Sequence, residues 1–247
     1  MAYTTLISAD QLLALMASDR PLMVFDCSFD LAQPQAGEQH FIEAHIPGAV
    51  RADLDRHLSS AKGDPTAASG GRHPLPAREA FAQWLGAVGF SHDMQAVVYD
   101  RQGVNFSGRL WWMLKWMGHE AVAVLDGGMP AWYAAGGVVT SGEATAHSPT
   151  PFTARAPHAR LVSAQQVLER LDDPGQQVID ARAGPRFRGE IEPLDPVAGH
   201  IPGALNRPFG NNIGDDGLFK PAVVLEAEFL ELLDGRDPST VVHQCGS

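Results

Sequence analysis

The stretch "AHIPGAV" (residues 44–50) returns in the second half of the chain as "GHIPGAL" (residues 199–205). Each copy has the composition of a tight turn, because proline fixes φ and glycine tolerates conformations that other residues avoid. The histidine of each copy, His45 or His200, can hydrogen-bond the loop that it opens. A turn repeated almost letter for letter indicates that the chain contains a duplicated fold.

Three further pairs of segments keep the same order in both halves. "LISADQLLALM" (residues 6–16) matches "LVSAQQVLERL" (residues 161–171), and both carry Ser-x-x-Gln, the capping-box pattern of a helix start. "LMVFD" matches "QQVID", and "QAVVYD" (residues 95–100) matches "STVVHQ" (residues 239–244). Four matches in one order predict a tandem repeat.

Helical patterns alternate with short apolar segments in both halves, which predicts an α/β fold with mainly parallel sheets flanked by helices. Between the halves, "SGEATAHSPTPFTARAPHAR" is rich in Ser, Thr, Pro and Ala and has no apolar period. It is typical of an extended linker. We therefore expect a first domain at residues 1–140, a linker at residues 141–160 and a second domain at residues 161–247.

The two predicted domains differ in length. After residue 100 the first continues with a glycine-bearing loop, a helix at about residues 109–117, a strand "AVAVL", a Gly-Gly turn and a helix around Trp132. The second has no counterpart of these elements. By analogy with the first, it needs on the order of 35 to 40 more residues to close, so we expect the second domain to be truncated at its C-terminal end.

The composition excludes several classes of partner. The 247 residues are 45% hydrophobic and 19% charged, enough for a packed core, and their formal net charge of −11 repels nucleic acid and acidic membranes. The start, "MAYTTLISAD", lacks the features of a signal peptide, and "LWWMLKWMG" is too short to span a bilayer. We expect a cytoplasmic monomer with no nucleic-acid or membrane partner.

The two cysteines are far apart, so they predict neither a disulfide framework nor a metal site. Cys27 lies inside the apolar "VFDCSF" and is expected to be inert. Cys245 follows "VVHQ", where the other copy has Arg101 after "VVYD", so this group is present in only one copy. Ligands of parallel sheets bind beyond the carboxyl ends of the strands, where backbone N–H groups stabilise a thiolate. Cys245 is therefore the candidate nucleophile, and an inert buried thiol is the alternative.

Features that both copies share are more typical of scaffold than of chemistry. The aspartates that end the first strands, Asp26 and Asp180, are expected to brace the neighbouring loops. For His45 and His200 a structural role is favoured for the same reason, because two such histidines cannot easily serve one site.

The tandem "D…HIPGA" halves, the first ending in "LDGGMPAW" and the second in "DAR…RF…GHIPGALN…CGS", resemble the two-domain rhodanese sulfurtransferases. The resemblance implies tandem rhodanese-like domains, the first non-catalytic and the second catalytic. It also implies that the Cys245 thiolate takes a sulfur from a small-molecule donor as a persulfide. A thiol, for example on a thioredoxin-like protein, or cyanide then removes that sulfur. No cofactor or metal is implied.

The neutral "CGS" resembles the 3-mercaptopyruvate branch of the family more than the thiosulfate branch, which places basic side chains there. In that branch Ser247 would help to polarise or protonate the donor, with His45 as its partner. The motif position of Arg186 matches the substrate-binding arginine of the family. Arg182 and Gly246 complete the implied substrate-binding set, while ordinary ion pairs are the alternative for the arginines.

Two departures weaken the choice of donor. Mercaptopyruvate enzymes usually carry a second arginine where "EPLDP" has Leu194, and the acidic residue expected before His45 is represented only by Glu38 and Glu43 nearby. Two other functions stay open. A phosphatase of the related cell-cycle type has a loop about one residue longer that ends in arginine, and a non-catalytic binding or regulatory module would not need Cys245.

Overall fold

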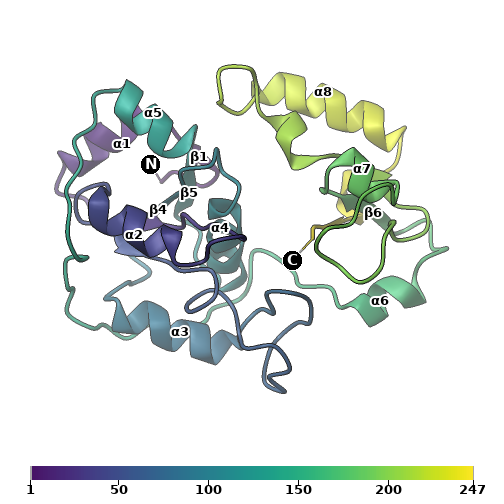
Figure 1. Cartoon of the computed structure of the whole chain (residues 1–247), viewed down its shortest axis with the longest axis horizontal. Coiled ribbons are helices and arrows are strands. Elements are labelled where there is room, and N and C mark those ends of the chain that lie inside the picture. Colours follow the sequence, from purple (N-terminus) through teal and green to yellow (C-terminus); the bar gives the residue numbers. More distant parts are fainter. Residues whose placement is uncertain (1, 247) are drawn as a thin grey trace. The chain divides into compact units, whose positions relative to one another are not determined.

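The computed structural model describes residues 2–246, and it divides the chain into two compact units. Unit 1 ends at Leu161 and unit 2 begins at Val162 (Figure 1). Within the described residues, no helix combines the length and the apolar character that crossing a membrane requires.

Unit 1 is built on a five-stranded sheet in which every pairing is parallel, in the order β1-β5-β4-β2-β3. The strands are β1 (Leu6–Ile7), β2 (Leu22–Asp26), β3 (Val50–Arg51), β4 (Gln95–Tyr99) and β5 (Val122–Leu125). The central strands β2 and β4 are mainly apolar and almost fully buried, as expected for a parallel sheet covered on both faces.

Five helices cover the two faces of this sheet. They are α1 (Ala9–Met16), α2 (Ala36–Glu43), α3 (Arg78–Ala87), α4 (Ser107–Trp116) and α5 (Gly128–Ala134). Buried residues of α3 and α4 pack on one face, and those of α1, α2 and α5 pack on the other; Figure 1 shows α3 and α5 on opposite sides of the sheet. Strand β4 serves both cores, with Val98 on the first face and Val97 and Tyr99 on the second.

Residues 141–160, hereafter the strap, were predicted to be a linker and contain no helix or strand. However, the strap packs along unit 1. The Thr150 N–H donates to Gly86 O at 2.9 Å, the Arg155 N–H donates to Met117 O at 3.0 Å, and Phe152 is buried in the core. The compact unit therefore extends to Leu161 instead of ending near residue 140.

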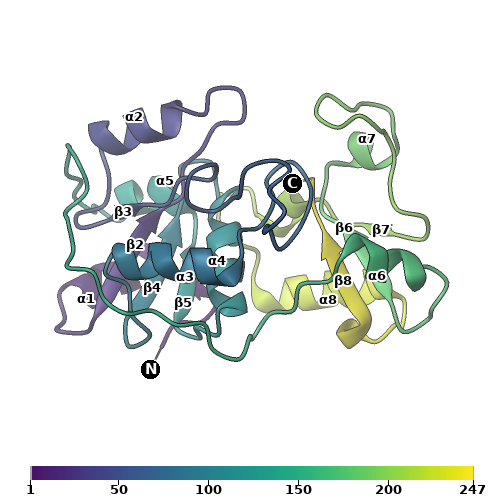
Figure 2. The ribbon, with the colours of Figure 1, turned by 90° about the horizontal axis from the view of Figure 1, so that it is seen from below.

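Unit 2 holds a three-stranded parallel sheet in the order β7-β6-β8 (Figure 2). Its strands are β6 (Gln177–Asp180), β7 (Leu205–Asn206) and β8 (Val241–Gln244). Its helices are α6 (Ala164–Glu169), α7 (Gly184–Phe187) and α8 (Ala222–Leu233), with 3-10 turns η1 (Phe209–Asn212) and η2 (Pro238–Thr240). Its buried core is small and centres on Val167, Val178 and Ala204.

Several local features of unit 1 recur in unit 2. Ser8 and Ser163 each form a complete capping box with the glutamine three residues later. Gly48 and Gly203, in the two HIPGA turns, share the same left-handed φ of 76°. Strand β6 pairs with β7 and β8 as β2 pairs with β3 and β4. Among the described residues, β8 is paired on one side only, whereas β4 is paired on both.

Candidate active site

Cys245 directly follows β8, at the carboxyl end of the unit 2 sheet. Asp180, the last residue of β6, pairs in register with Gln244, and the Ala181 N–H donates to Gln244 O at 2.9 Å. Cys245 is exposed and forms no disulfide. The thiol therefore stands at the edge of a parallel sheet where ligands usually bind.

The strand register identifies the counterpart of Cys245 in unit 1. Asp26 pairs with Tyr99 as Asp180 pairs with Gln244, so the residue after the pair is Asp100 in one unit and Cys245 in the other. Alignment of the shared Val-Val letters places Arg101 opposite the cysteine instead. That alignment is wrong by one residue, because strand pairing and not letter identity sets the equivalence.

Asp100 shows what the backbone does at this position. Its buried carboxylate accepts four backbone N–H groups from the loop that follows β4 and leads into α4. The donors and N···O distances are Gln102 (3.0 Å) and Val104 (2.9 Å) to Oδ1, and Phe106 (2.8 Å) and Ser107 (2.9 Å) to Oδ2. Left-handed backbone at Gly103 and Val104 turns these amides inward. The loop is an anion-binding nest closed by its own carboxylate.

Arg182 lies on the turn after β6 and is tied to the sheet. Its guanidinium donates to both carboxylate oxygens of Asp180, at 2.7 to 3.1 Å, and to Gly199 O at 2.7 Å. Hydrogen bonding to Asp180, the largest effect, raises the pKa of Arg182. Asp180 therefore braces this loop, as the sequence predicted for the strand-end aspartates.

Arg186 lies on α7 and is held by two carboxylates that the sequence reasoning had not singled out. Nε and Nη2 of Arg186 donate to Glu192 at 2.8 to 3.1 Å, and Nη2 also donates to Asp195 at 2.9 Å. Burial, the largest single effect, raises the pKa of Glu192. Hydrogen bonds from the Asp195 N–H, the Arg186 side chain and the Leu194 N–H outweigh it and lower that pKa to about 2.

Both arginines lie close to Gly246, the residue after the candidate nucleophile. A Cβ atom on Gly246 would lie 2.9 Å from Arg186 Nη1 and 3.3 Å from Arg182 Cδ. Only glycine leaves this space to the guanidinium and to the arginine stem. The structure thus brings together Cys245, Gly246, Arg182 and Arg186, while Ser247 lies outside the described residues.

The two HIPGA histidines have the same local geometry. His45 Nδ1 lies 2.7 Å from Phe41 O with the rings stacked at 3.9 Å, and His200 Nδ1 lies 2.7 Å from Phe187 O with the rings stacked at 3.7 Å. His45 is 1% exposed. This shared arrangement favours the structural interpretation of both side chains.

The missed residues Glu192 and Asp195 did have a sequence signal. "EPLDP" places two carboxylates three residues apart on a proline turn, and the Leu194 and Asp195 N–H groups both donate to Glu192 Oε1 at 3.0 Å. The acidic pair flanks Leu194, the position where an arginine was expected, and it pairs with an arginine from α7 instead.

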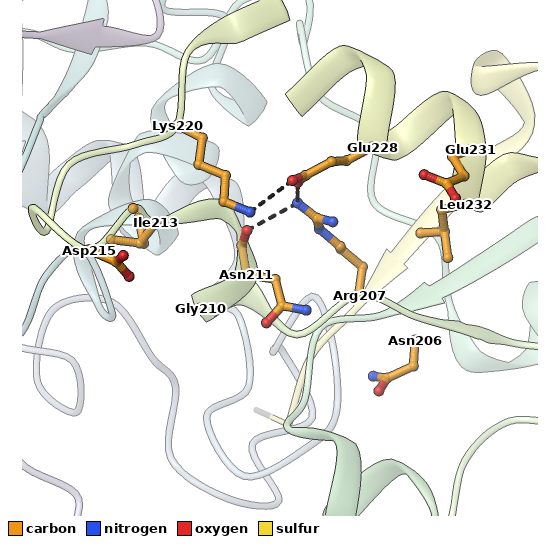
Figure 3. Close-up of a pocket in the computed structure, with 11 residues that line it drawn as sticks. Asn206, Arg207, Gly210, Asn211, Ile213, Asp215, Lys220, Glu228, Glu231 and Leu232 are labelled. Carbon is orange, nitrogen blue, oxygen red and sulfur yellow. Dashed lines mark hydrogen bonds and ion pairs between the residues drawn. The ribbon is translucent and has the colours of Figure 1, made fainter. Parts of the chain in front are cut away.

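A separate polar cavity of about 770 Å³ lies in unit 2, between the loop after β7 and α8 (Figure 3). Arg207 and Lys220 point to opposite oxygens of Glu228, at 2.5 and 2.9 Å. Asn206, on its wall, donates to the carbonyls of Asp180 and Arg182, at 3.0 and 2.9 Å. Arg207 and Lys220 are thus both paired with Glu228. The Asn206 side chain stabilises the turn that carries Arg182.

Comparison with known proteins identifies relatives of this chain. A family model described as "Rhodanese-like domain" matches residues 8–135. The chain is 44% identical to the "Probable 3-mercaptopyruvate sulfurtransferase" of Pseudomonas aeruginosa, over 100% of this chain and 86% of that protein. It is 34% identical to the thiosulfate sulfurtransferase of Bos taurus, over 84% of this chain and 69% of that protein.

A solved structure gives the same relation in three dimensions. The crystal structure of SseA from Escherichia coli, described with the "Rhodanese" fold of 3-mercaptopyruvate sulfotransferases, superposes with a TM-score of 0.79 at 29% identity. The match covers 98% of this chain and 88% of that one.

Proposed function

The chain belongs to the rhodanese family of sulfurtransferases, and we propose that it moves a sulfane sulfur from 3-mercaptopyruvate to a thiol acceptor through a persulfide on Cys245. The observation that carries the proposal is the exposed thiol at the carboxyl end of β8, next to a glycine whose open side faces Arg182 and Arg186. A thiolate beside donor groups for an anion is the arrangement that covalent sulfur transfer needs.

The proposed first half-reaction balances without a cofactor. The Cys245 thiolate attacks the sulfur of 3-mercaptopyruvate, an S–S bond forms and the C–S bond breaks. The electron pair stays on carbon as the enolate of pyruvate, which takes up the proton released by the terminal sulfur. The products are pyruvate and a cysteine persulfide anion. An acceptor thiolate then attacks the outer sulfur, and Cys245 leaves as the thiolate.

Residues of the chain have distinct proposed roles in this step. The Arg186 guanidinium binds the donor carboxylate. Arg182 is held in place by Asp180, and its side chain packs against Gly246. Two further roles stay predictions: that Ser247 protonates the donor, and that His45 is the partner of Ser247. Unit 1 is non-catalytic in this proposal, because Asp100 occupies the position of the nucleophile.

Thiosulfate is the alternative donor, since the same attack would release sulfite from it. The neutral residue after Cys245 and the similarity to the Pseudomonas protein support 3-mercaptopyruvate. We further propose that the acceptor is a small thiol or a thioredoxin-like protein and that the protein works as a cytoplasmic monomer.

Intact-mass spectrometry after incubation with each donor tests the proposal. We expect a gain of one sulfur, roughly 32 Da, that is removed by a reducing thiol and forms faster with 3-mercaptopyruvate than with thiosulfate. Cys245→Ala should abolish the gain, and the matched Cys27→Ala should keep it. If neither donor adds sulfur to the wild-type protein, the proposed function is wrong.

A further inference from the structure

The guanidinium of Arg186 has one edge that is occupied by carboxylates and one edge that faces Gly246, the residue after the candidate nucleophile. Its Nε and Nη2 atoms donate to both oxygens of Glu192, and Nη2 also donates to Asp195. Nη1 points to the open side of Gly246, and within residues 2–246 it makes no hydrogen bond. Glu192 therefore orients the arginine so that its remaining N–H groups face the residue next to Cys245.

The carboxylates that pair with Arg186 and Arg182 outnumber these two arginines. Arg186 pairs with Glu192 and Asp195, and Arg182 pairs with Asp180 and, at 3.5 Å, with Glu192. Two guanidinium groups are thus joined to three carboxylates, so the network carries a formal charge of −1 when all five groups are ionised. Among these five groups, directed N–H donors are therefore present without an excess of positive charge.

We propose that Asp195 is a specificity residue, which by pairing with Arg186 makes the site accept a donor with a single carboxylate and discriminate against a doubly charged one. The inference rests on the proposed function of Cys245. One carboxylate is bound mainly by short, directional hydrogen bonds, which the Arg186 N–H groups supply. The second negative charge of a doubly charged donor gains only long-range electrostatic attraction to the site. Each carboxylate that pairs with Arg186 weakens that attraction. 3-Mercaptopyruvate has one such charge at neutral pH, and thiosulfate has two.

Asp195 and Glu192 differ in what their removal would do. The Glu192 side chain is 4% exposed and also accepts the N–H groups that form its own turn, so its loss would disturb the position of Arg186. The Asp195 side chain is 31% exposed. Asp195→Asn therefore removes the charge while it keeps the shape of the side chain. Asp173→Asn is the matched control, because Asp173 pairs with Arg170 at 2.8 Å on the surface of unit 2.

The test is protection of Cys245 from iodoacetamide by pyruvate, with one charge, and by sulfate, with two, at constant ionic strength. Peptide mass spectrometry measures labelling, and the buried Cys27 serves as an internal blank. We expect wild-type protein to be protected at lower concentrations of pyruvate than of sulfate. Asp195→Asn should lower the half-protecting sulfate concentration about three- to tenfold and that of pyruvate less than about twofold, as expected for loss of one nearby charge. Asp173→Asn should change neither.

Three results would overturn the proposal. These are an equal shift for both anions in Asp195→Asn, no shift for either, and no protection of the wild-type thiol by either anion. Persulfide formation separates this failure from failure of the proposed function. A protein that forms the persulfide but shows equal shifts loses only the role of Asp195. A protein that shows the selective shift but forms no persulfide keeps the charge filter and loses the sulfur transfer.

Discussion

The two thiols of the chain show how residue environment decides reactivity. Cys27 is 1% exposed, and burial, together with the negative charges of Asp26 and Asp100, raises the pKa of its thiol well above the usual value. Cys245 is exposed and follows a strand end. The sequence predicted this contrast from neighbours alone, since Cys27 lies in an apolar run and Cys245 precedes Gly and Ser.

Gly246 gives the sharpest prediction at the scale of single residues. Gly246→Ala would place a Cβ 2.9 Å from Arg186 Nη1, so the Arg186 guanidinium would have to move away from Gly246. The flexible side chain of Arg186 allows this movement without a change in the fold. We expect KM for 3-mercaptopyruvate to rise about tenfold with a change in melting temperature of less than about 2 °C. Steady-state kinetics and thermal unfolding measure the two effects.

The control for this substitution is Gly210→Ala. A Cβ on Gly210 would meet no atom within 4 Å, and the residue has no left-handed φ. It should change neither KM nor stability. A large fall in melting temperature for Gly246→Ala, with KM unchanged, would show that Gly246 supports the fold and does not leave room for Arg186.

The partners of the two arginines could not be predicted from the sequence. Residue type and motif position were the grounds for choosing Arg182 and Arg186, and both lie beside Gly246. These grounds were not enough to predict that Glu192 and Asp195 hold Arg186, because a side chain's partner depends on how a turn folds back. The same limit applies to His45, whose stacked partner Phe41 is four residues away on α2.

Among the elements, the strap lies very close to three glycines at or after the ends of helices α3 and α4. A Cβ on Gly86, Gly89 or Gly118 would come within 2.5 to 2.8 Å of strap atoms, such as Thr150 O and Ala156 O. From composition the strap was predicted to be an extended linker, and it contains no helix or strand. Composition could not predict the docking, because the complementary surface is distributed over helix ends far away in sequence.

We expect Gly118→Ala to release part of the strap. Gly118 follows the C-cap of α4 with φ 77°, and its Cβ would lie 2.5 Å from Ala156 O, a backbone atom that cannot easily move. The free energy of unfolding should fall by about 1 kcal/mol for the left-handed φ and by about 2 kcal/mol more for the overlap. Urea unfolding measures the total, and limited proteolysis of residues 141–160 measures the release.

Gly136→Ala is the matched control for the strap. Gly136 also follows the C-cap of its helix, α5, with φ 75°, but its Cβ would meet no atom within 4 Å. It should show only the conformational cost, about 1 kcal/mol. Equal losses for the two variants would mean that contact with the strap contributes nothing.

Across the whole chain, the repeated sequence segments made the fold class predictable, but they concealed the register of one strand. Repeated capping boxes, strand ends and HIPGA turns were enough to predict two units with parallel sheets. The one-residue offset at β8 was not visible, because Val-Val can be aligned in two ways and only hydrogen bonding to β6 chooses between them. That offset replaces Arg101 by Asp100 as the counterpart of Cys245, and it makes unit 1 a guide to the chemistry of unit 2.

Asp100→Cys tests whether the shared position stabilises a thiolate. The four N–H groups that now bind the Asp100 carboxylate would bind the new sulfur, preferring its anion. The folded-state pKa of the introduced thiol should therefore lie below the usual value of about 8.5. A depressed pKa stabilises the fold above the unfolded-state pKa, and this stabilisation is lost as the pH falls through the folded-state pKa.

Urea unfolding at pH 6 and pH 9 measures this effect, with Asp100→Ser as the control that fills the same site without ionising. The free energy of unfolding of Asp100→Cys, relative to Asp100→Ser, should be about 1 to 2 kcal/mol larger at pH 9 than at pH 6. Cys27 is present in both variants, so its own titration cancels. A difference that does not change with pH would mean that the nest fits a carboxylate but not a sulfur anion. The chemistry of Cys245 would then have to come from groups that are peculiar to unit 2, such as Arg182 and Arg186 beside Gly246.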